Sequence, residues 1–345
     1  MNRYTIRDYD EYLNLESGMN PHQVQLWKTN RIDESKGIVD DYLPITEELY
    51  DALIRTEPIP FNNETAYLAY SLLNYEFKQT DLFMASCSIV VFTGTKDNSN
   101  FLGRDAKILK DSYRMINSNF TIRIEDKFLD SENGKKEFYE LMAHELQHAY
   151  RFYNIFLSNN SYNNEEFERM KRYNDAYNVQ RNTSNPIEYE VSTIYYLSDR
   201  NEISSESNKL YEYLRNHNEI NEGNINEYFN ENMPLYTIKE SLKYFLEKLD
   251  SETRTDDMTY VRHIGEVYKR IIDDTKMTPS RAFIKFRTRV VDAAIFANRL
   301  FKRTLAKAFD DFDRRINTPN GSNLAKEIIE TNKDFDLLRE ILNRH

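Results

Sequence analysis

Cysteine is nearly absent from this sequence, and its scarcity excludes two kinds of stabilisation. Cys87 is the only cysteine among 345 residues, so the chain cannot form an internal disulfide or a zinc ribbon with cysteine ligands. Cys87 lies in an apolar run, where we expect it to behave as a small buried hydrophobic residue. The fold must therefore be stabilised mainly by burial of apolar side chains, for which this length is sufficient.

Long apolar runs are also lacking, which bears on membrane association. No stretch approaches the roughly 20 apolar residues that a transmembrane helix needs. The opening residues, MNRYTIRDYDEYLNLESG, lack the apolar segment of a signal peptide. We therefore expect a protein without a signal peptide or membrane span, located in the cytoplasm or within a virion or other large complex.

The sequence has no excess of positive charge. Lysine and arginine number 46 against 57 aspartate and glutamate residues, which gives a formal net charge of −11. An acidic protein repels the phosphates of a nucleic acid over most of its surface, although a local basic patch remains compatible with this balance. The charge therefore argues against nucleic acid as a partner.

Apolar periodicity predicts both helices and strands in the first part of the chain. Helices are expected at residues 46–55 and 64–77. The β-branched run SCSIVVFTG, residues 86–94, predicts a buried strand. The alternation at the start of FTIRIEDKFLD, residues 120–130, predicts a half-buried strand. After the turn SENG, a further helix is expected from about Lys135 onward.

The rest of the chain combines polar segments with helical ones. Residues 157–185 and 201–232 are rich in Asn, Ser and Glu, which is typical of loops with short helical pieces. Thr278 and the proline after it form a good N-cap and N1 pair for a helix over residues 279–315. Such a helix would be about 55 Å long, and we expect it to be too long for one compact domain.

This long helix carries an uneven distribution of charge. Between Arg281 and Lys307 its basic residues are Arg281, Lys285, Arg287, Arg289, Arg299, Lys302, Arg303 and Lys307, against one acid, Asp292. One interpretation is an ordinary solvated face. The other is a docking surface, because an amphipathic helix of this length would expose part of its apolar stripe. On the second interpretation, residues 279–315 mediate self-association or docking into a larger assembly, weakened by salt.

The stretch LMAHELQHAYRFYN contains the most specific pattern in the sequence. His144 and His148 are four residues apart, so on a helix both imidazoles can reach one metal ion. Zinc accepts neutral imidazole nitrogen, and two ligands on adjacent turns satisfy its geometry. Glu145 lies one residue round from His144, where it can take a proton from a metal-bound water. The pattern therefore predicts a Zn²⁺ site with Glu145 as the catalytic base.

In H144-E145-L146-Q147-H148 the chain resembles the zincin metallopeptidases. The resemblance implies a mixed sheet packed on the HExxH helix, with the strand at residues 120–130 at the edge of the substrate cleft. The metzincin branch would need glycine at position 151 and histidine at position 154. Arg151 and Asn154 stand there instead, so that branch is excluded.

The thermolysin-like gluzincin branch implies a third metal ligand from a glutamate on a later helix. NPIEYEVSTIYYL, residues 185–197, is the matching place, and Glu188 is the glutamate that the resemblance favours. Ser192 would then stand where the family has a polar residue that hydrogen-bonds back to a zinc histidine. If Asn185 is the N-cap, however, Glu188 occupies the capping-box position N3. In that case Glu190 is the ligand, or neither glutamate is.

A peptidase also needs a hydrogen-bond donor for the developing oxyanion. The sequence offers His217, His263, Tyr195 and Tyr196, and no spacing distinguishes one of them. For each of them, a packing or surface role is the simpler interpretation.

Together these patterns predict a fold class and an organisation. The fold class is α+β, with a zincin-like core of a small mixed sheet and an active-site helix, followed by a mostly helical C-terminal region. The predicted division is residues 1–85, a mostly helical segment; 86–200, the metallopeptidase core; 201–232, a polar linker; and 233–345, the helical C-terminal region.

The predicted function is that of a zinc-dependent hydrolase, most simply a peptidase acting on a polypeptide. The alternative is a structural or assembly protein, such as a phage virion component, that retains the fold with or without activity.

Overall fold

The protein is described from a computed structural model. Main chain and side chains are described for residues 46–47, 50–51, 54–55, 128, 131–148, 172, 176, 179–180, 182–251 and 258–315. For five strands between residues 59 and 125, and for residues 149–158 and 252–253, the main chain alone is described. The chain forms two compact units, Lys36–Leu157 on the one hand and Met1–Ser35 with Ser158–His345 on the other.

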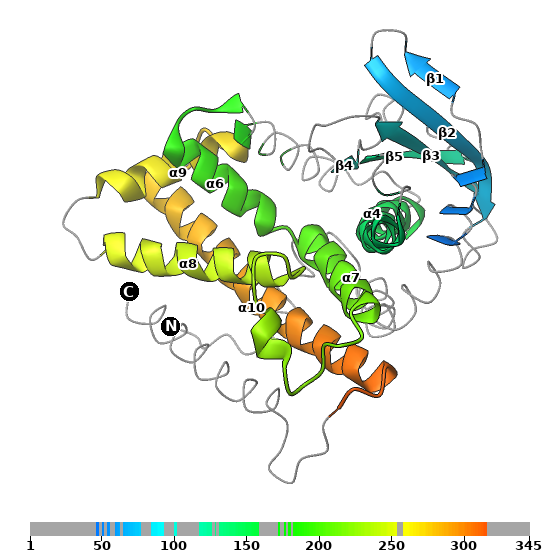
Figure 1. Ribbon diagram of the computed structural model, residues 1–345. Helices are drawn as coiled ribbons and strands as arrows, with labels where there is room; N and C mark the ends of the chain where they lie inside the picture. The colour runs from blue at the N-terminus through cyan, green and yellow to red at the C-terminus, as the bar shows by residue number, and fades with distance from the viewer. Residues whose placement is uncertain are drawn as a thin grey trace. The chain divides into compact units, whose positions relative to one another are not determined.

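The unit Lys36–Leu157 contains a five-stranded sheet and one long helix. The strands are β1 Ile59–Asn62, β2 Thr65–Glu76, β3 Met84–Phe92, β4 Asn100–Phe101 and β5 Asn117–Glu125, in the order β1-β2-β3-β5-β4. Strands β3 and β5 run parallel and the other neighbours are antiparallel. The helix is α4, Glu132–Ser158, which carries the HELQH residues (Figure 1).

Strand β2 lies where the sequence predicted a helix over residues 64–77, and that prediction is wrong. The segment TAYLAYSLLNYE has tyrosine and leucine at positions that suit helical spacing and also suit a strand. Its pairing with β3, from Tyr67 opposite Phe92 to Glu76 opposite Met84, is a non-local interaction that overrides the local pattern. The segments predicted as strands, residues 86–94 and 120–130, carry β3 and β5.

The predicted fold class is corrected. The residues whose side chains are described are 79% helical and include no strand, so a zincin-like core built on a mixed sheet is not shown. The packed side chains of the described residues come mainly from helices, and they are held together by helix-on-helix contact. For these residues the fold class is therefore helical.

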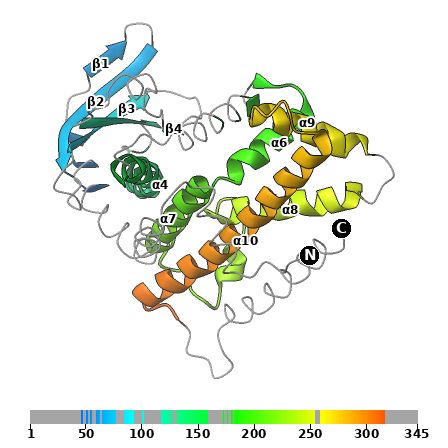
Figure 2. The ribbon, with the colours of Figure 1, turned by 180° about the vertical axis from the view of Figure 1, so that it is seen from behind.

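The second unit is a group of helices arranged along one of them. Its elements are α6 Pro186–Leu197, α7 Arg200–Asn216, the 3₁₀ helix η2 Ile225–Tyr228, α8 Tyr236–Thr253, α9 Thr259–Ile271 and α10 Pro279–Asp311. Helix α10 packs against α7, α8 and α9, and α6 packs against α8 and α9 (Figures 1 and 2). The core of this unit therefore lies on the apolar face of α10.

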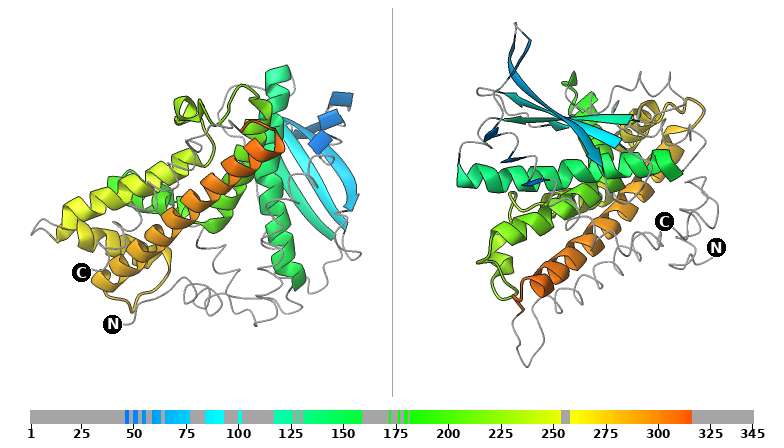
Figure 3. Two further views of the ribbon diagram at one scale, coloured as in Figure 1. Left: turned by 90° about the horizontal axis from the view of Figure 1, so that it is seen from below. Right: turned by 90° about the vertical axis from the view of Figure 1, so that its right-hand side faces the viewer.

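Helix α10 confirms the predicted long helix and its start. Thr278 is the N-cap, its side chain accepts a hydrogen bond from the backbone N–H of Arg281, and Pro279 opens the helix. The helix continues without interruption to Asp311 (Figure 3). Its aromatic residues Phe286, Phe301 and Phe309 are fully buried, and Ala282, Ala297 and Ala308 allow close approach of neighbouring helices.

The expectation that α10 is too long for one compact unit is wrong. At 33 residues it spans about 50 Å, and different neighbours cover successive parts of its apolar stripe. Most of the stripe is therefore buried within the unit, although Ile284 of α10 is 63% exposed. Docking through residues 279–315 stays a prediction. No helix in the described part of the chain is long and apolar enough to cross a bilayer.

The basic residues of α10 divide into two sets. Arg287 pairs with Asp250 at 2.7 Å, and Lys307 pairs with Asp311 at 3.0 Å. Arg289 lies over the ring of Tyr195 and pairs with Asp199. Arg287 and Arg289 therefore hold α10 against neighbouring parts of the unit, and Lys307 forms an ion pair within α10. Exposed positions on α10 are held by Arg281, Lys285, Arg299 and Arg303.

Helix α7 occupies half of the segment predicted as a polar linker, residues 201–232. Its polar composition hid its periodicity, because buried Ser205 and Ser207 interrupt the apolar face formed by Ile203, Leu210 and Leu214. The Ser207 hydroxyl hydrogen-bonds to that of Thr304 on α10 at 2.6 Å. The prediction of a loop here was therefore wrong, because a buried serine of α7 finds its hydrogen-bond partner on a neighbouring helix. The four-part division stays a prediction.

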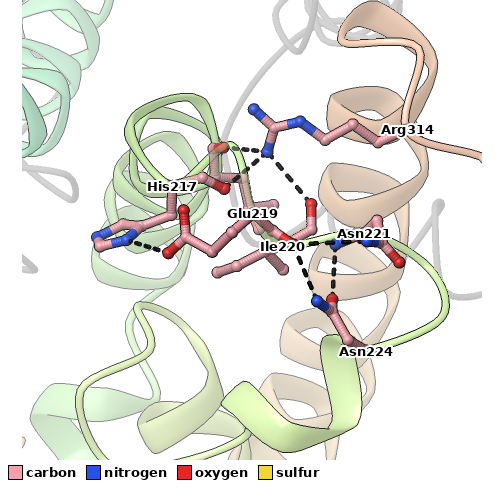
Figure 4. A network of polar contacts seen from close by, with 7 residues as sticks. His217, Glu219, Ile220, Asn221, Asn224 and Arg314 are labelled. Atoms are coloured by element: carbon pink, nitrogen blue, oxygen red, sulfur yellow. Dashed lines mark hydrogen bonds and ion pairs between the residues drawn. The ribbon is translucent and has the colours of Figure 1, made fainter.

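The C-terminal end of α7 is held by one arginine. Nη1 of Arg314 donates to the carbonyl oxygens of Leu214 at 2.7 Å and His217 at 2.8 Å, and more weakly to that of Ile220 (Figure 4). The last carbonyls of a helix lack partners inside it, so a cation there satisfies them and opposes the helix dipole. Burial lowers the pKa of the Arg314 guanidinium, and the Glu219 carboxylate opposes that shift.

The first prediction concerns the crossing of α9 and α10. A Cβ placed on Gly265 would overlap the backbone carbonyl of Pro279, which cannot rotate away as a side chain could. The better helix propensity of alanine would stabilise by about 1 kcal/mol, but overpacking against backbone costs about 1–3 kcal/mol or more. We expect Gly265→Ala to lower the free energy of unfolding, measured in urea, by about 2 kcal/mol.

Ile284→Ala is the control, because this side chain is 63% exposed on α10. It should change stability by about 0.5 kcal/mol or less. A Gly265→Ala protein as stable as the wild type would show that the two helices can separate at no cost.

The second prediction concerns the α7 terminus. Replacing Arg314 by methionine keeps the approximate length of the side chain and removes the donor to the carbonyls of Leu214 in α7 and of His217 at its C-cap. The His217 carbonyl then keeps only the backbone N–H of Ile220, at 3.2 Å. We expect a loss of about 1–3 kcal/mol in the free energy of unfolding. The matched control is Arg315→Met, because Arg315 is more exposed and pairs with Asp310 at the surface, where such pairs contribute about 0–1 kcal/mol. Equal effects of the two substitutions would contradict this role for Arg314.

Candidate metal centre

Helix α4 places both histidines and the glutamate of HELQH on a largely buried segment. Met142 and Leu146 are buried to 0% and 2% exposure, as the apolar flanks predicted. His144 and Glu145 are also buried, and His148 is half-buried. Burial of three polar groups in one helical turn costs free energy unless they are paired or bind something. This turn is therefore the candidate site.

The two imidazoles face each other across one helical turn. Nε2 of His144 and Nε2 of His148 are 3.0 Å apart, with the rings inclined at 79°. At that distance one nitrogen donates a hydrogen and the other accepts it, which a neutral pair satisfies. Two imidazole ligands at about 2.0–2.1 Å in tetrahedral geometry are roughly 3.3–3.4 Å apart. The pair would have to open by only a few tenths of an ångström, so these residues fit a zinc ion.

Glu188, the predicted third ligand, takes part in contacts within its own unit. One carboxylate oxygen accepts a hydrogen bond from Arg270 on α9, and the other accepts from the Thr183 hydroxyl at 2.8 Å. These bonds, that from Thr183 first, lower the pKa of Glu188. The backbone N–H of Asn185 instead donates to Thr183, so Glu188 closes no capping box. Its role as ligand stays a prediction.

Glu190, the alternative metal ligand, also accepts hydrogen bonds from other side chains. Lys248 of α8 donates to one oxygen at 2.6 Å, and the Tyr260 hydroxyl of α9 donates to the other at 2.9 Å. Burial, with the neighbouring Glu190 carboxylate adding to it, raises the pKa of Tyr260 to about 12. Through these contacts, Glu188 and Glu190 join α6 to α8 and α9. A role in holding the helices together therefore accounts for both glutamates.

Glu202 is a buried carboxylate that the sequence did not single out. It lies in the first turn of α7 and is 5% exposed. One of its oxygens accepts a hydrogen bond from the Tyr196 hydroxyl at 2.6 Å. The segment was predicted as a polar linker, so a buried glutamate was not expected there.

Ser192, the residue to which the resemblance gives a hydrogen bond to a zinc histidine, lies in the helical unit, and that bond stays a prediction. The residue is fully buried on α6, and its hydroxyl oxygen has no hydrogen-bond partner among the described residues. A buried hydroxyl without a partner costs about 1–3 kcal/mol. In the helical unit, Ser192 therefore acts as a small side chain that fits the buried face of α6.

The candidate oxyanion donors have different surroundings. His217 caps the end of α7 and bonds to Glu219 at 3.1 Å, and His263 is exposed on α9. Tyr195 is buried beneath Arg289. The Tyr196 hydroxyl donates to Glu202 of α7 at 2.6 Å. Cys87 lies on β3, and its side chain is outside the described residues.

Comparisons with protein-family models, curated proteins and solved structures give no match. The candidate function therefore rests on the chemistry of these side chains.

Proposed function

We propose that the protein is a zinc-dependent hydrolase that cleaves peptide bonds, with zinc held by His144 and His148. The observation that carries the proposal is the pair of facing Nε2 atoms, 3.0 Å apart on a buried turn. An ordinary amphipathic helix would expose two such polar rings to water. Here the arrangement supports two neutral imidazoles directed at one point, as zinc requires.

Glu188 is the proposed third ligand, on the resemblance of residues 185–197 to the gluzincin pattern. Its carboxylate is bonded to Arg270 and to the Thr183 hydroxyl, so it must exchange the arginine for the metal ion. Glu190 is the competing ligand, and one experiment separates the two.

Glu145 is the proposed general base. Bound zinc would polarise a peptide carbonyl and lower the pKa of a coordinated water. Glu145 follows His144 directly on α4, and its side chain is 5% exposed. In this shielded position its carboxylate takes a proton from the attacking water and passes that proton to the leaving amine. Burial also excludes bulk water, which would otherwise weaken these electrostatic interactions.

The third prediction concerns zinc binding, measured by elemental analysis after dialysis and by competition with a chelator. The wild type should hold one zinc per chain. His148→Ala should abolish stoichiometric binding, because one imidazole cannot hold the ion. Glu188→Gln should weaken binding by about 10-fold or more, because it removes the proposed third ligand. Glu190→Gln should leave binding unchanged, because Lys248 and Tyr260 hold that carboxylate.

The reverse ranking of the two glutamine variants would assign the third ligand to Glu190. A full equivalent of tightly held zinc in His148→Ala would overturn the metal site itself. His263→Ala serves as the control, because His263 is an exposed histidine on α9 and should bind as the wild type does.

The fourth prediction separates catalysis from metal binding. Glu145→Gln keeps the shape of the side chain and removes the base. We expect zinc to remain bound while peptide hydrolysis, measured on an unstructured polypeptide, falls by about 10²-fold or more. Equal turnover by the two proteins would exclude Glu145 as the base. Bound zinc with no turnover in either protein would support a structural role in an assembly.

A further inference from the structure

Helix α10 carries a row of basic side chains on one face. Arg281 and Arg299 are separated by about five turns of 3.6 residues, and so are Lys285 and Arg303, so the four lie in one row about 33 Å long. All four side chains are exposed, and none forms an ion pair with a described residue. Asp292 is the acid within this row, and its charge acts on an arginine of α7. The row therefore keeps a net positive charge at the surface.

This basic row lies on the side of α10 that faces away from α8. Phe286 and Phe301, on the other side of α10, contact Phe245 and Tyr236 of α8 at ring-centre distances of 5.7 and 5.9 Å. Helix α8 lies in front of α10 in Figure 1, and α10 lies in front of α8 in Figure 2, which is seen from behind. The basic row and α8 are therefore on opposite sides of the helical unit.

The α8 side of the unit is acidic. It exposes three glutamates that have no ion pair with a described residue: Glu227 in η2, Glu231 after it and Glu247 on α8. The η2 segment belongs to this side, because the ring of Phe229 stacks on that of Tyr236 of α8 at 5.1 Å. Lys243 is the exposed cation of α8. This acidic side therefore has the charge that would complement the basic row.

Each of the two sides also exposes one large side chain with an apolar surface. Ile284, next to Lys285 in the basic row, is 63% exposed, and Tyr244 of α8 is 69% exposed. Tyrosine and arginine are enriched among the residues that contribute most to protein–protein binding. Both sides therefore combine charge with an apolar contact, as the surface of an interface does.

We infer that the helical unit binds a second copy of the chain head to tail, with the basic row of α10 against the acidic side formed by α8 and η2. The two surfaces cannot meet within one copy, because α8 and α10 lie between them. The chain itself supplies the complementary surface, so a second copy is the partner that this arrangement fits. Contact between two different surfaces is heterologous, so each pair can add a third copy. The inference is independent of metal binding and hydrolysis.

Sedimentation equilibrium of the full chain, from about 10 μM to about 1 mM, covers the range of weak dissociation constants. In about 0.1 M salt, where the Debye length is about 10 Å, the average mass should rise with concentration beyond that of a dimer. In about 1 M salt, where the Debye length is about 3 Å, it should return to that of the monomer. A chain that stays monomeric at the lower salt, or that stops at a dimer, would overturn the inference.

Charge reversal on each side in turn gives two matched variants. Arg299→Glu with Arg303→Glu alters the basic row, and Glu227→Lys with Glu231→Lys alters the acidic side. Each variant alone should self-associate about 10-fold or more weakly than the wild type, because like charges then meet. The two variants change the net charge in opposite directions, so a loss in both cannot arise from net charge. All four positions are exposed, so circular dichroism of both variants should match that of the wild type.

An equimolar mixture of the two variants completes the test. The unaltered basic row of one variant can bind the unaltered acidic side of the other, and the two reversed surfaces also complement each other. The mixture should therefore associate about as strongly as the wild type, and a mixture of folded variants that stays monomeric would overturn the inference. Self-association of either variant at the wild-type level would overturn it too. If the wild type stays monomeric but binds anionic phospholipid vesicles or a DNA duplex through Arg299 and Arg303, the basic row serves that partner and the inference fails.

Discussion

Burial of the apolar face of α10 is the interaction on which the helical unit depends. Four helices, α6, α7, α8 and α9, contact this one helix, and the aromatic side chains Phe286 and Phe301 are almost fully excluded from water. Each such side chain contributes about 1.5–3 kcal/mol relative to an exposed one. Close approach is equally necessary, because helices separated by a gap lose these contacts. Gly265 allows this close approach of the helices where α9 crosses the start of α10.

Packing on α10 determines where charges can lie. Acids on the helices meet cations from other helices of the unit, in the pairs Glu188–Arg270, Glu190–Lys248, Asp250–Arg287 and Asp199–Arg289. Several of these cations reach the acid along an apolar stem, so their pairing adds buried contact as well as charge. The unit thereby uses its basic residues internally, although the chain as a whole is acidic. The acid-rich motif on α6 is accounted for by this scaffold role.

Features with local signals could be predicted from the sequence. Thr278 and the proline after it mark the start of α10, and the histidine spacing places HELQH on a helix, because caps and i,i+4 neighbours depend on residues close in the chain. The strand β2 and the helix α7 could not be predicted. Strand β2 forms because it pairs with β3, and α7 can bury Ser207 because the Thr304 hydroxyl shares a hydrogen bond with it. Both depend on partners distant in the sequence.

The same distinction explains the candidate metal centre. The spacing of His144 and His148 was sufficient to predict that their rings face each other, since one helical turn decides it. Nothing local distinguishes Glu188 from Glu190, because both are glutamates on one helix. Each carboxylate accepts hydrogen bonds from other helices of its unit, Glu188 from Arg270 and Glu190 from Lys248 and Tyr260. A carboxylate paired with a cation must exchange that cation for a metal ion, so metal binding at either glutamate includes the cost of breaking these pairs. The choice of the third ligand therefore depends on tertiary contacts, which motif spacing does not encode.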